Sequence, residues 1–448
     1  MPFYEILAYM KYSTTEKYST NDVFGVKSKL IKSYIERERV DSKFKEALHD
    51  GNEVIVYGSS KQGKTSLILK HLKEEDYVKI ECSPQTLPID IYKSVLRQLK
   101  ITFIESSTEN RSSEEAAKIS GGFKIKVPFI GDLGVDNELS GKDTSGLLTK
   151  HNYIEYNLTL AQDFSELLKL YKVDKYIILE NFHYLSLEVQ ESLAYDLRVF
   201  QDSHIIFIIL GIWREANRLV QYNGDLLDRI TEVPVEPWDR NDFNLVIEKG
   251  AKLLNVNFKN IQSQILNSAF DSIGVVQEIC KYCCLSAGVT ETQDSELTLQ
   301  DEHLQKALKK KADDYGVRHI RNFESFVDIL RKTSTQSGKA SLAVPYYLIK
   351  ILLVSDIENI EAGLSRALLL EEIRKIHHRA TDFRSSDLGA FLHNITQHQV
   401  SKKIQPPFLD YDRGGKILKV IDSSLYFYLR NCNRQEILDD LPNPLDEE

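Results

Sequence analysis

The chain has 448 residues, of which 42% are hydrophobic and 27% are charged, and its formal net charge at pH 7 is −9. This length is enough for two or three domains with cores of their own, and the composition is that of an ordinary globular protein. The overall acidity gives no general sign of nucleic-acid binding, no run of about eighteen apolar residues predicts a membrane helix, and the five cysteines are too few for a disulfide framework. We therefore expect a cytoplasmic protein without a membrane anchor.

Residues 1–25 show little periodicity and are expected to be irregular, and we assign residues 1–34 to an N-terminal arm. The stretch SYIERERVDSKFKEALHDGN that follows places apolar residues on one helical face. This pattern predicts a helix that ends shortly before residue 53.

Residues 53–66, EVIVYGSSKQGKTS, join a short apolar run to a glycine-rich stretch. The spacing Gly58-x4-Gly63-Lys64-Thr65 is that of a phosphate-binding loop (P-loop) between a buried strand and a helix. In such a loop successive backbone N–H groups face an anion, and glycine permits the backbone angles that this requires. A plain turn between strand and helix is the simpler alternative, but the complete motif in this context favours nucleotide binding.

The chemistry of a nucleotide triphosphate assigns roles within this loop. Lys64 is expected to reach the β- and γ-phosphates of ATP, and Thr65 to offer its hydroxyl group to Mg²⁺. The positive N-terminal end of the helix beginning near residue 64 adds to the attraction. The predicted phosphate-binding residues are Gly58, Ser59, Ser60, Lys61, Gln62, Gly63, Lys64, Thr65 and Ser66.

Apolar strands separated by helical segments continue along the chain as far as ITEVPVEP. This alternation predicts a parallel sheet with helices, so we expect an α/β P-loop domain over residues 35–237. Residues 105–150 are an excursion within it. A polar stretch there is followed by FKIKVPFIGDLGVD, which predicts a hairpin with its turn at Gly131–Gly134.

The strand YIILEN supplies the acid that a P-loop site needs for its metal ion. Glu180 follows four apolar residues and is expected to hold Mg²⁺ together with Thr65. Asn181 stands where such ATPases often carry the acid that polarises the attacking water, and an amide cannot accept that proton. Either Glu180 or His183 substitutes as the base, or Glu180 merely ends a strand.

Two arginines occupy positions at which a cation can act on the transferring phosphate. Arg214 lies just past the strand IIFIILGIW, and Arg229 lies just before the last strand. In multimeric ATPases the position of Arg229 often supplies an arginine finger to a neighbouring subunit. Either residue can instead be an ordinary surface arginine.

The remainder of the chain predicts two helical modules and a tail. Residues 238–335 are expected to form a helical lid and basic linker helices, with the cysteines of EICKYCCLSAG packed in the core because zinc would need four converging ligands. Residues 336–435 combine three helical segments with FLDYDRGGKILKVID, a predicted hairpin, which is the pattern of a winged helix. Residues 436–448 are an acidic tail.

These motifs together resemble the AAA+ superfamily, in particular its STAND-type and origin-recognition-like branch, in which a P-loop ATPase domain is followed by a helical lid and a winged helix. The resemblance covers roughly residues 30–430 and rests on GSSKQGKT, YIILEN, GIWRE and LLDRI. It implies that the segment before the P-loop packs on adenine, with Ile35 and Arg37 as the contacts. The ending ILKVIDSSLYFYLRN is similar to prokaryotic STAND-like ATPases, several of which act in defence against phage.

The chain departs from these relatives at positions that fast catalysis uses. Gln277 lies where they carry an arginine sensor or a Gly-x-Pro turn, and a neutral amide does not stabilise transferring phosphate as arginine does. With Asn181 as well, we expect slow hydrolysis. ATP would then act as a switch that biases lid closure, self-association and the binding of an unidentified protein partner.

The alternative from the sequence is a DNA-binding loader or transposition-helper ATPase, with ATP gating its assembly. The predicted recognition helix, residues 385–399, contains no Arg or Lys, although basic residues follow it. The candidate phosphate contacts to DNA are Lys402, Lys403, Arg413, Lys416 and Lys419. A small-molecule kinase fits less well, because the lid and the winged helix would have no role in it.

Overall fold

The structure is a computed structural model, and it describes residues 16–25, 29–105, 123–128, 153–269, 272–329 and 341–443. The contacts within the chain divide it into two compact units. The sheet unit comprises residues 42–57 and 71–233. The lid unit comprises residues 1–41, 58–70 and 234–448, so the P-loop belongs to the lid unit.

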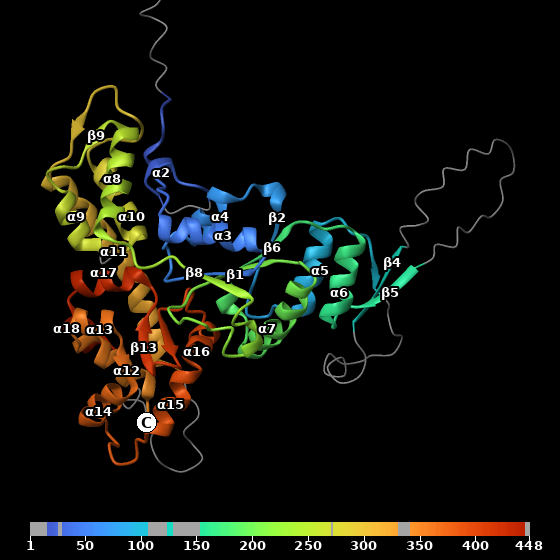
Figure 1. The fold of residues 1–448 in the computed structure, drawn as a ribbon. Coiled ribbons are helices and arrows are strands. Elements are labelled where there is room, and N and C mark those ends of the chain that lie inside the picture. Colours follow the sequence, from blue (N-terminus) through green and yellow to red (C-terminus); the bar gives the residue numbers. More distant parts are fainter. Residues whose placement is uncertain are drawn as a thin grey trace, which may run out of the picture. The chain divides into compact units, whose positions relative to one another are not determined.

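A parallel sheet of five strands forms the centre of the sheet unit, in the order β2-β6-β7-β1-β8 (Figure 1). The pairs β2–β6, β6–β7 and β1–β7 are all parallel, which confirms the predicted α/β class. Every residue of β1 and of β7 is buried, as the continuous apolar runs of the sequence predict. The strands are β1 (Glu53–Tyr57), β2 (Tyr77–Glu81), β6 (Tyr176–Glu180), β7 (Phe207–Gly211) and β8 (Ile230–Pro234).

Three amphipathic helices, α5, α6 and α7, pack against one face of this sheet and close a single core (Figure 1). Tyr92 of α5 stacks on Phe164 of α6 at 4.5 Å between ring centroids, and Phe200 of α7 stacks on Phe207 of β7 at 4.8 Å. Such aromatic pairs fix how the helices cross the sheet. The helical segments of this unit are α3 (Lys43–Asp50), η2 (Glu74–Asp76), α5 (Pro88–Gln98), α6 (Ala161–Leu170), η5 (Phe182–Tyr184), α7 (Leu187–Asp202) and η6 (Gly224–Leu226).

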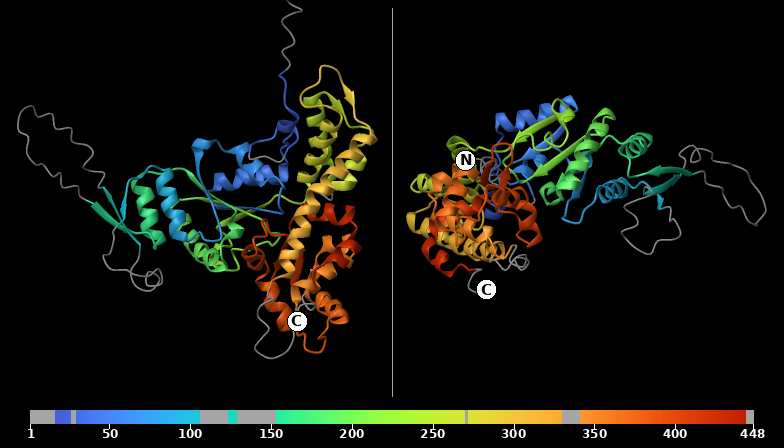
Figure 2. Two further views of the ribbon diagram at one scale, coloured as in Figure 1. Left: turned by 180° about the vertical axis from the view of Figure 1, so that it is seen from behind. Right: turned by 90° about the horizontal axis from the view of Figure 1, so that it is seen from below.

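A small antiparallel sheet extends the sheet unit beyond α5 and α6 (Figures 1 and 2). Its order is β3 (Ile104–Glu105), β4 (Lys124–Pro128) and β5 (Tyr153–Asn157). The predicted turn at 131–134 lies outside the described residues. What the structure shows is that β4 pairs with β5 along its whole length, a partner some 25 residues away that local alternation does not reveal.

Residues 240–327 of the lid unit form helices and two short strands, and the same unit holds the described part of the N-terminal arm. The segment expected to be irregular forms a short helix, α2 (Thr20–Val23), and buries Phe24 against Phe258 at 5.6 Å. The cysteines at 280, 283 and 284 are buried in the same core. The lid elements are α8 (Arg240–Leu254), β9 (Val256–Asn257), α9 (Gln262–Ala269), α10 (Ile273–Ser286), β10 (Leu297–Thr298) and α11 (Asp301–Val327).

The C-terminal module, residues 344–440, contains helices and a three-stranded antiparallel sheet of order β11-β13-β12. The predicted hairpin is confirmed as β12 and β13. The elements are α12 (Val344–Val354), α13 (Ile357–Ala362), β11 (Leu364–Ser365), α14 (Arg366–Ile376), α15 (Ser385–His393), α16 (Ile395–Ser401), β12 (Leu409–Asp412), β13 (Ile417–Val420), α17 (Ser423–Asn431) and α18 (Arg434–Asp440).

The recognition helix expected as one element over residues 385–399 is instead broken at Asn394 into α15 and α16. The buried Gln399 explains the break, because its side-chain amide takes over backbone bonding at the start of β12. Its Nε2 donates to Leu409 O at 2.7 Å, and its Oε1 accepts from Phe408 N at 2.9 Å. These bonds tie α16 to the start of the hairpin.

The long helix α11 runs from the lid helices into the C-terminal module (Figure 2). Phe326 near its end packs edge-on against Phe391 and Phe408 of the module, at 5.9 and 5.4 Å. The lid and the module therefore share one hydrophobic core. Among the described helices, none is both long enough and apolar enough to cross a membrane.

Candidate functional site

The P-loop has the strand–loop–helix context that its sequence predicts. β1 ends at Tyr57, and α4 (Lys64–His71) begins at the lysine of the motif. Gly63 has φ +90° and Gly58 has φ +150°, both in the region that side chains with a Cβ rarely adopt. A Cβ on Gly58 would also lie 2.7 Å from Cγ2 of Val235, so this glycine permits the close approach of the segment after β8.

The Lys64 side chain reaches back to the start of the P-loop, the loop that would bind phosphate. Its Nζ donates to the carbonyl oxygens of Gly58, at 2.9 Å, and of Ser59, at 2.7 Å. The ammonium group and the N-terminal end of α4 both lie at this loop, and together they concentrate positive charge there. The arrangement suits a multiply charged anion.

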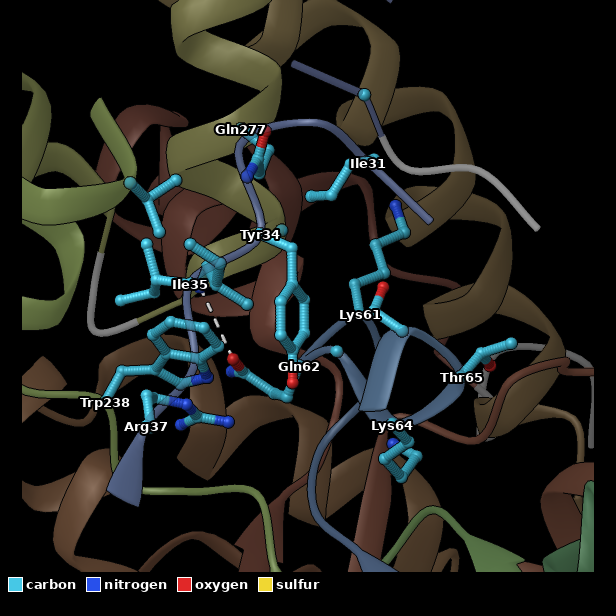
Figure 3. A pocket seen from close by; sticks show the side chains of 16 residues that line it. Ile31, Tyr34, Ile35, Arg37, Lys61, Gln62, Lys64, Thr65, Trp238 and Gln277 are labelled. Atoms are coloured by element: carbon cyan, nitrogen blue, oxygen red, sulfur yellow. Dashed lines mark hydrogen bonds between the residues drawn. The ribbon is translucent and has the colours of Figure 1, made fainter. Parts of the chain in front are cut away.

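A cavity adjoins the loop on the side of the lid (Figure 3). Polar and charged residues of the P-loop line one part of it, and apolar and aromatic side chains, with Arg37 and Gln277 among them, line the other part. A site that combines a few polar groups with apolar walls suits a phosphate group joined to a flat base. All lining residues belong to the lid unit. They are Gly25, Ile31, Tyr34, Ile35, Arg37, Lys61, Gln62, Gly63, Lys64, Thr65, Ser66, Trp238, Val246, Ile273, Gly274 and Gln277.

Arg37 and Trp238 form one wall of this cavity (Figure 3). The Arg37 guanidinium lies 3.6 Å from the centroid of the Trp238 ring, and its Nη1 donates to Val235 O at 2.8 Å. Burial lowers the pKa of Arg37 to about 10, so the group remains charged at neutral pH. A planar cation stacked on a planar ring is a rigid wall for a nucleobase.

The segment carrying Tyr34 and Arg37 is fixed by Asp41. This buried carboxylate accepts from the Tyr34 hydroxyl at 2.6 Å and from the Arg37 backbone N–H at 2.7 Å. Two bonds to one carboxylate close the turn and hold both side chains at the cavity. Ile35 lies between them and lines the same cavity.

Helix α10 borders the cavity with Ile273, Gly274 and Gln277. The buried Gln277 donates from Nε2 to the hydroxyl of Ser33 at 3.0 Å. The Ile273 backbone N–H donates to Gln62 Oε1 at 3.3 Å, which is the dashed line at Gln62 in Figure 3. Gln277 therefore ties the lid to the segment before the P-loop. Because its amide is used in this way, it does not replace the arginine sensor that its position suggested.

Glu180 and Asn181 lie in the sheet unit at the carboxyl end of β6. The Glu180 carboxylate accepts from Lys79 Nζ at 2.9 Å. Asn181 has φ +61°, a left-handed conformation that asparagine tolerates better than most residues. His183 is buried, and its Nδ1 accepts the Ile212 backbone N–H at 3.3 Å, which occupies the nitrogen lone pair that a base would use.

The two candidate arginines also lie in the sheet unit. Arg214 is half-buried three residues beyond the end of β7. Arg229 forms an ion pair with Asp202 and donates to Gln201 Oε1 at 2.8 Å, both at the end of α7 in the same chain. The Arg229 side chain is therefore held by its own subunit.

The structure thus gathers Ile35, Arg37 and residues 61–66 around one cavity, whereas Glu180, Asn181, Arg214 and Arg229 lie in the sheet unit. The expected Mg²⁺ ligands, Thr65 and Glu180, come from different units and remain a prediction. Their hydroxyl and carboxylate oxygens are the donor types that Mg²⁺ prefers. Within the described residues, no group of three His, Cys, Asp or Glu side chains is placed to hold a metal.

Sequence reasoning missed several residues of the cavity. Tyr34 and Trp238 carry no motif, although a tryptophan directly after the last strand is a signal that could have been weighed. Ile31, Val246 and Ile273 come from three separate segments, and only the fold brings them together.

No protein-family model matches the chain, and no curated protein matches it. Among solved structures it is similar to the Walker-type ATPase PABY2304 of Pyrococcus abyssi, with a TM-score of 0.51 and 18% identity over 91% of this chain and 99% of that chain. The chain has the α/β fold of a P-loop ATPase. More distant likenesses are to Cdc6p from Pyrobaculum aerophilum, with a TM-score of 0.37, 10% identity and coverage of 90% and 93%, and to the Orc1 protein of Aeropyrum pernix, solved with DNA, with a TM-score of 0.38, 11% identity and coverage of 96% and 98%.

Proposed function

We propose that the protein is an ATP-binding regulatory ATPase of the AAA+/STAND type, in which Mg·ATP drives lid closure, self-association and engagement of a partner. The observation that carries the proposal is the single cavity in which the P-loop, Arg37 and Trp238 meet. The P-loop accounts for the triphosphate and the stacked wall accounts for the base.

Slow turnover is part of the proposal. Asn181 cannot act as a base, Gln277 is bound to Ser33, and Arg229 is bound to Asp202. Three groups that would accelerate phosphoryl transfer in a fast ATPase are thus chemically unsuited or already engaged. ATP then serves chiefly as a ligand whose differential affinity shifts the population between open and closed lids.

The lid contacts support this switch. Gln277 binds Ser33, and the Ile273 N–H binds Gln62. Helix α10 therefore contacts both the segment before the P-loop, which would pack on the nucleobase, and the P-loop itself. A nucleotide filling the cavity would contact the same three segments. Its binding energy would therefore favour the closed lid.

Binding of DNA through the C-terminal module is the second candidate function. Lys403 and Lys416 are exposed, but the other basic side chains are engaged within the chain: Lys402 pairs with Asp328, Lys419 pairs with Asp412, and Arg413 donates to His393 O. Filter binding to duplex DNA at two salt concentrations tests it. DNA binding that weakens steeply with salt supports a DNA-binding loader ATPase. Absence of DNA binding at low salt rejects this function.

Isothermal titration calorimetry with ATP, ADP and GTP in the presence of Mg²⁺ tests the main proposal. Lys64→Ala should lose ATP binding, because the P-loop loses the charge opposite the phosphates. Lys73→Ala, at an exposed lysine with an ion pair to Glu75, is the matched control and should bind as wild type. A wild-type protein that binds none of the nucleotides would refute the proposal.

Two further measurements test the finer parts of the proposal. Size-exclusion chromatography with ATP and with ADP should show different oligomers, and an unchanged monomer would remove self-association. A role in defence against phage rests on the resemblance of the C-terminal sequence. It predicts that a host carrying the wild-type gene, but not the Lys64→Ala variant, resists infection in a plaque assay.

A further inference from the structure

Three successive residues of the C-terminal module bind the P-loop at Ser60. The Ser60 backbone N–H donates to Ile421 O at 3.0 Å. The Ser423 hydroxyl donates to Ser60 O at 3.0 Å, and the Ser60 hydroxyl lies 3.4 Å from Asp422 Oδ1. Both polar backbone groups of one loop residue and its side chain are thus bound by a segment more than 350 residues away.

Asp422 is the centre of this contact, and it is fully buried. It caps α17 by accepting from the Ser424 N–H at 3.0 Å, and it forms an ion pair with Arg318 of α11 at 2.6 Å. Burial by itself would raise the pKa of Asp422, but the charge of Arg318, the hydrogen bond from the Ser424 hydroxyl and the charge of Lys61 hold it below its ordinary value. The carboxylate is therefore charged and fixed in position beside the loop.

The next loop residue, Lys61, is held from two sides. It has φ +60°, and its Nζ lies 5.2 Å from the centroid of the Tyr315 ring on α11. The backbone of α10 lies directly against it, because a Cβ on Gly274 would come within 2.6 Å of Lys61 Cβ. In Figure 3 the Lys61 side chain leaves the loop in a different direction from Lys64.

We propose that Asp422 and Ser423, with Arg318 as counter-ion, are positioning residues for the phosphate-binding loop, so that docking of the C-terminal module and binding of nucleotide strengthen each other. The inference rests on the proposed function and names the contact through which the C-terminal module joins it. The module would hold Ser60 and Lys61 in the conformation from which residues 61–66 bind phosphate.

The coupling between the docked module and the nucleotide is expected to be positive because the module bonds to loop atoms that the phosphates do not need. The bonds from residues 421–423 to the loop go to the N–H, the carbonyl and the hydroxyl of Ser60. Ser60 is among the predicted phosphate-binding residues, but its N–H is bonded to Ile421 O and it does not line the cavity. None of the three bonds uses an N–H of residues 61–66, which do line the cavity. The docked module therefore braces the loop without competing with the ligand, and by linkage a bound nucleotide must stabilise the docked module by the same factor.

Calorimetry with ADP on the full-length chain tests the effect of the module on the ligand. Ser423→Ala removes one bond to Ser60 and should weaken ADP binding by roughly threefold to tenfold. Asp422→Asn removes the charge opposite Arg318 and should weaken it at least as much. Asp412→Asn is the matched control, because Asp412 pairs with Lys419 in the same module and makes no bond to the loop, and it should bind as wild type.

Hydrogen exchange on the wild-type protein tests the reverse effect and does not depend on any variant folding. Saturating ADP should slow exchange of the backbone amides of α17 and leave those of α14, which has no bond to Ser60, unchanged. Wild-type affinity in Ser423→Ala, or unchanged exchange in α17, would overturn the inference while the nucleotide site stands. Absence of ADP binding by the wild type would instead refute the proposed function itself.

Discussion

Lys79 on β2 donates a hydrogen bond to the carboxylate of Glu180 on β6, with 2.9 Å between Nζ and Oε2. The two strands are adjacent and parallel, and Glu81 pairs with Glu180 in their register. The acid expected to hold Mg²⁺ is thus already partly neutralised by a lysine, which is a further reason to expect slow hydrolysis.

Replacement of this lysine should release the carboxylate. In Lys79→Met, the Mg²⁺ concentration for half-maximal ATP hydrolysis should fall by about fivefold, since a hydrogen bond between charged groups contributes roughly 1.5–3 kcal/mol and solvent screening reduces it at this half-exposed pair. A magnesium titration of the hydrolysis rate measures this. Lys93→Met, which breaks the ion pair with Glu105, is the control, and an equal effect in both variants would remove Glu180 from the metal site.

Asn181→Asp should raise hydrolysis by at least about tenfold, because a positioned base contributes about 10²–10⁴ in rate. Aspartate is the appropriate replacement, since Asn181 has φ +61° and aspartate accepts this conformation readily. Steady-state phosphate release measures the rate. Asn217→Asp alters another asparagine of positive φ, +57°, and should leave the rate unchanged. If Asn181→Asp gives no increase, another residue already acts as the base.

Gly274→Ala should destabilise the protein by about 1–3 kcal/mol and weaken ATP binding, because the new methyl group would overlap Lys61. The nearest atoms are Cβ and the carbonyl oxygen of Lys61, at 2.6 and 2.8 Å, and neither can move without the loop. Alanine is otherwise favoured over glycine in a helix by about 1 kcal/mol, so a loss cannot come from helix propensity. Chemical denaturation and calorimetry measure the two effects. Gly224→Ala, with open space around it, is the control.

His319 should make the lid unit sensitive to mild acid. Burial lowers its pKa to about 4, from an ordinary value of 6.5, although Asp422 opposes the shift. As the pH is lowered from 6.5 to 4, the unfolded chain takes up a proton that the folded chain does not. His319 therefore lowers the free energy of unfolding by up to about 3 kcal/mol over this range, and above pH 6.5 its contribution does not change.

Urea denaturation at a series of pH values measures this dependence. Arg318 and Lys61 also face His319 but keep their charge throughout the range, so they do not produce the change. His319→Gln should flatten the profile between pH 6.5 and 4. The control His49→Gln, at an exposed histidine, should keep the wild-type profile. Identical profiles for all three proteins would contradict the assignment to His319.

The local parts of this fold follow from local sequence. The strand before Gly58 and the helix from Lys64 are predictable because residues 54–57 are a continuous apolar run and the glycines require unusual backbone angles. The hairpin of β12 and β13 is predictable because its turn and its alternation are adjacent in the chain. In each case the forces that decide the structure act over fewer than about fifteen residues.

The parts that escaped prediction depend on distant partners. β4 pairs with β5 across a long intervening segment, and the break at Asn394 is set by bonds from Gln399 to β12. For the same reason Ile35 and Arg37 could be predicted only from the resemblance to known ATPases. Trp238 and the bonds from residues 421–423 to Ser60 were not predicted and are seen only in the structure. No periodicity in one segment reports which other segment will cover it.

The helix α11 sets a practical limit on dissecting this protein. Because Phe323 and Phe326 at its end pack on Phe408 at 5.7 and 5.4 Å, a cut near residue 335 would leave large aromatic rings facing water. An expression fragment that stops there should be insoluble or misfolded, even though it keeps every residue of the nucleotide cavity. Experiments on the proposed nucleotide site therefore need a chain that extends at least through α17.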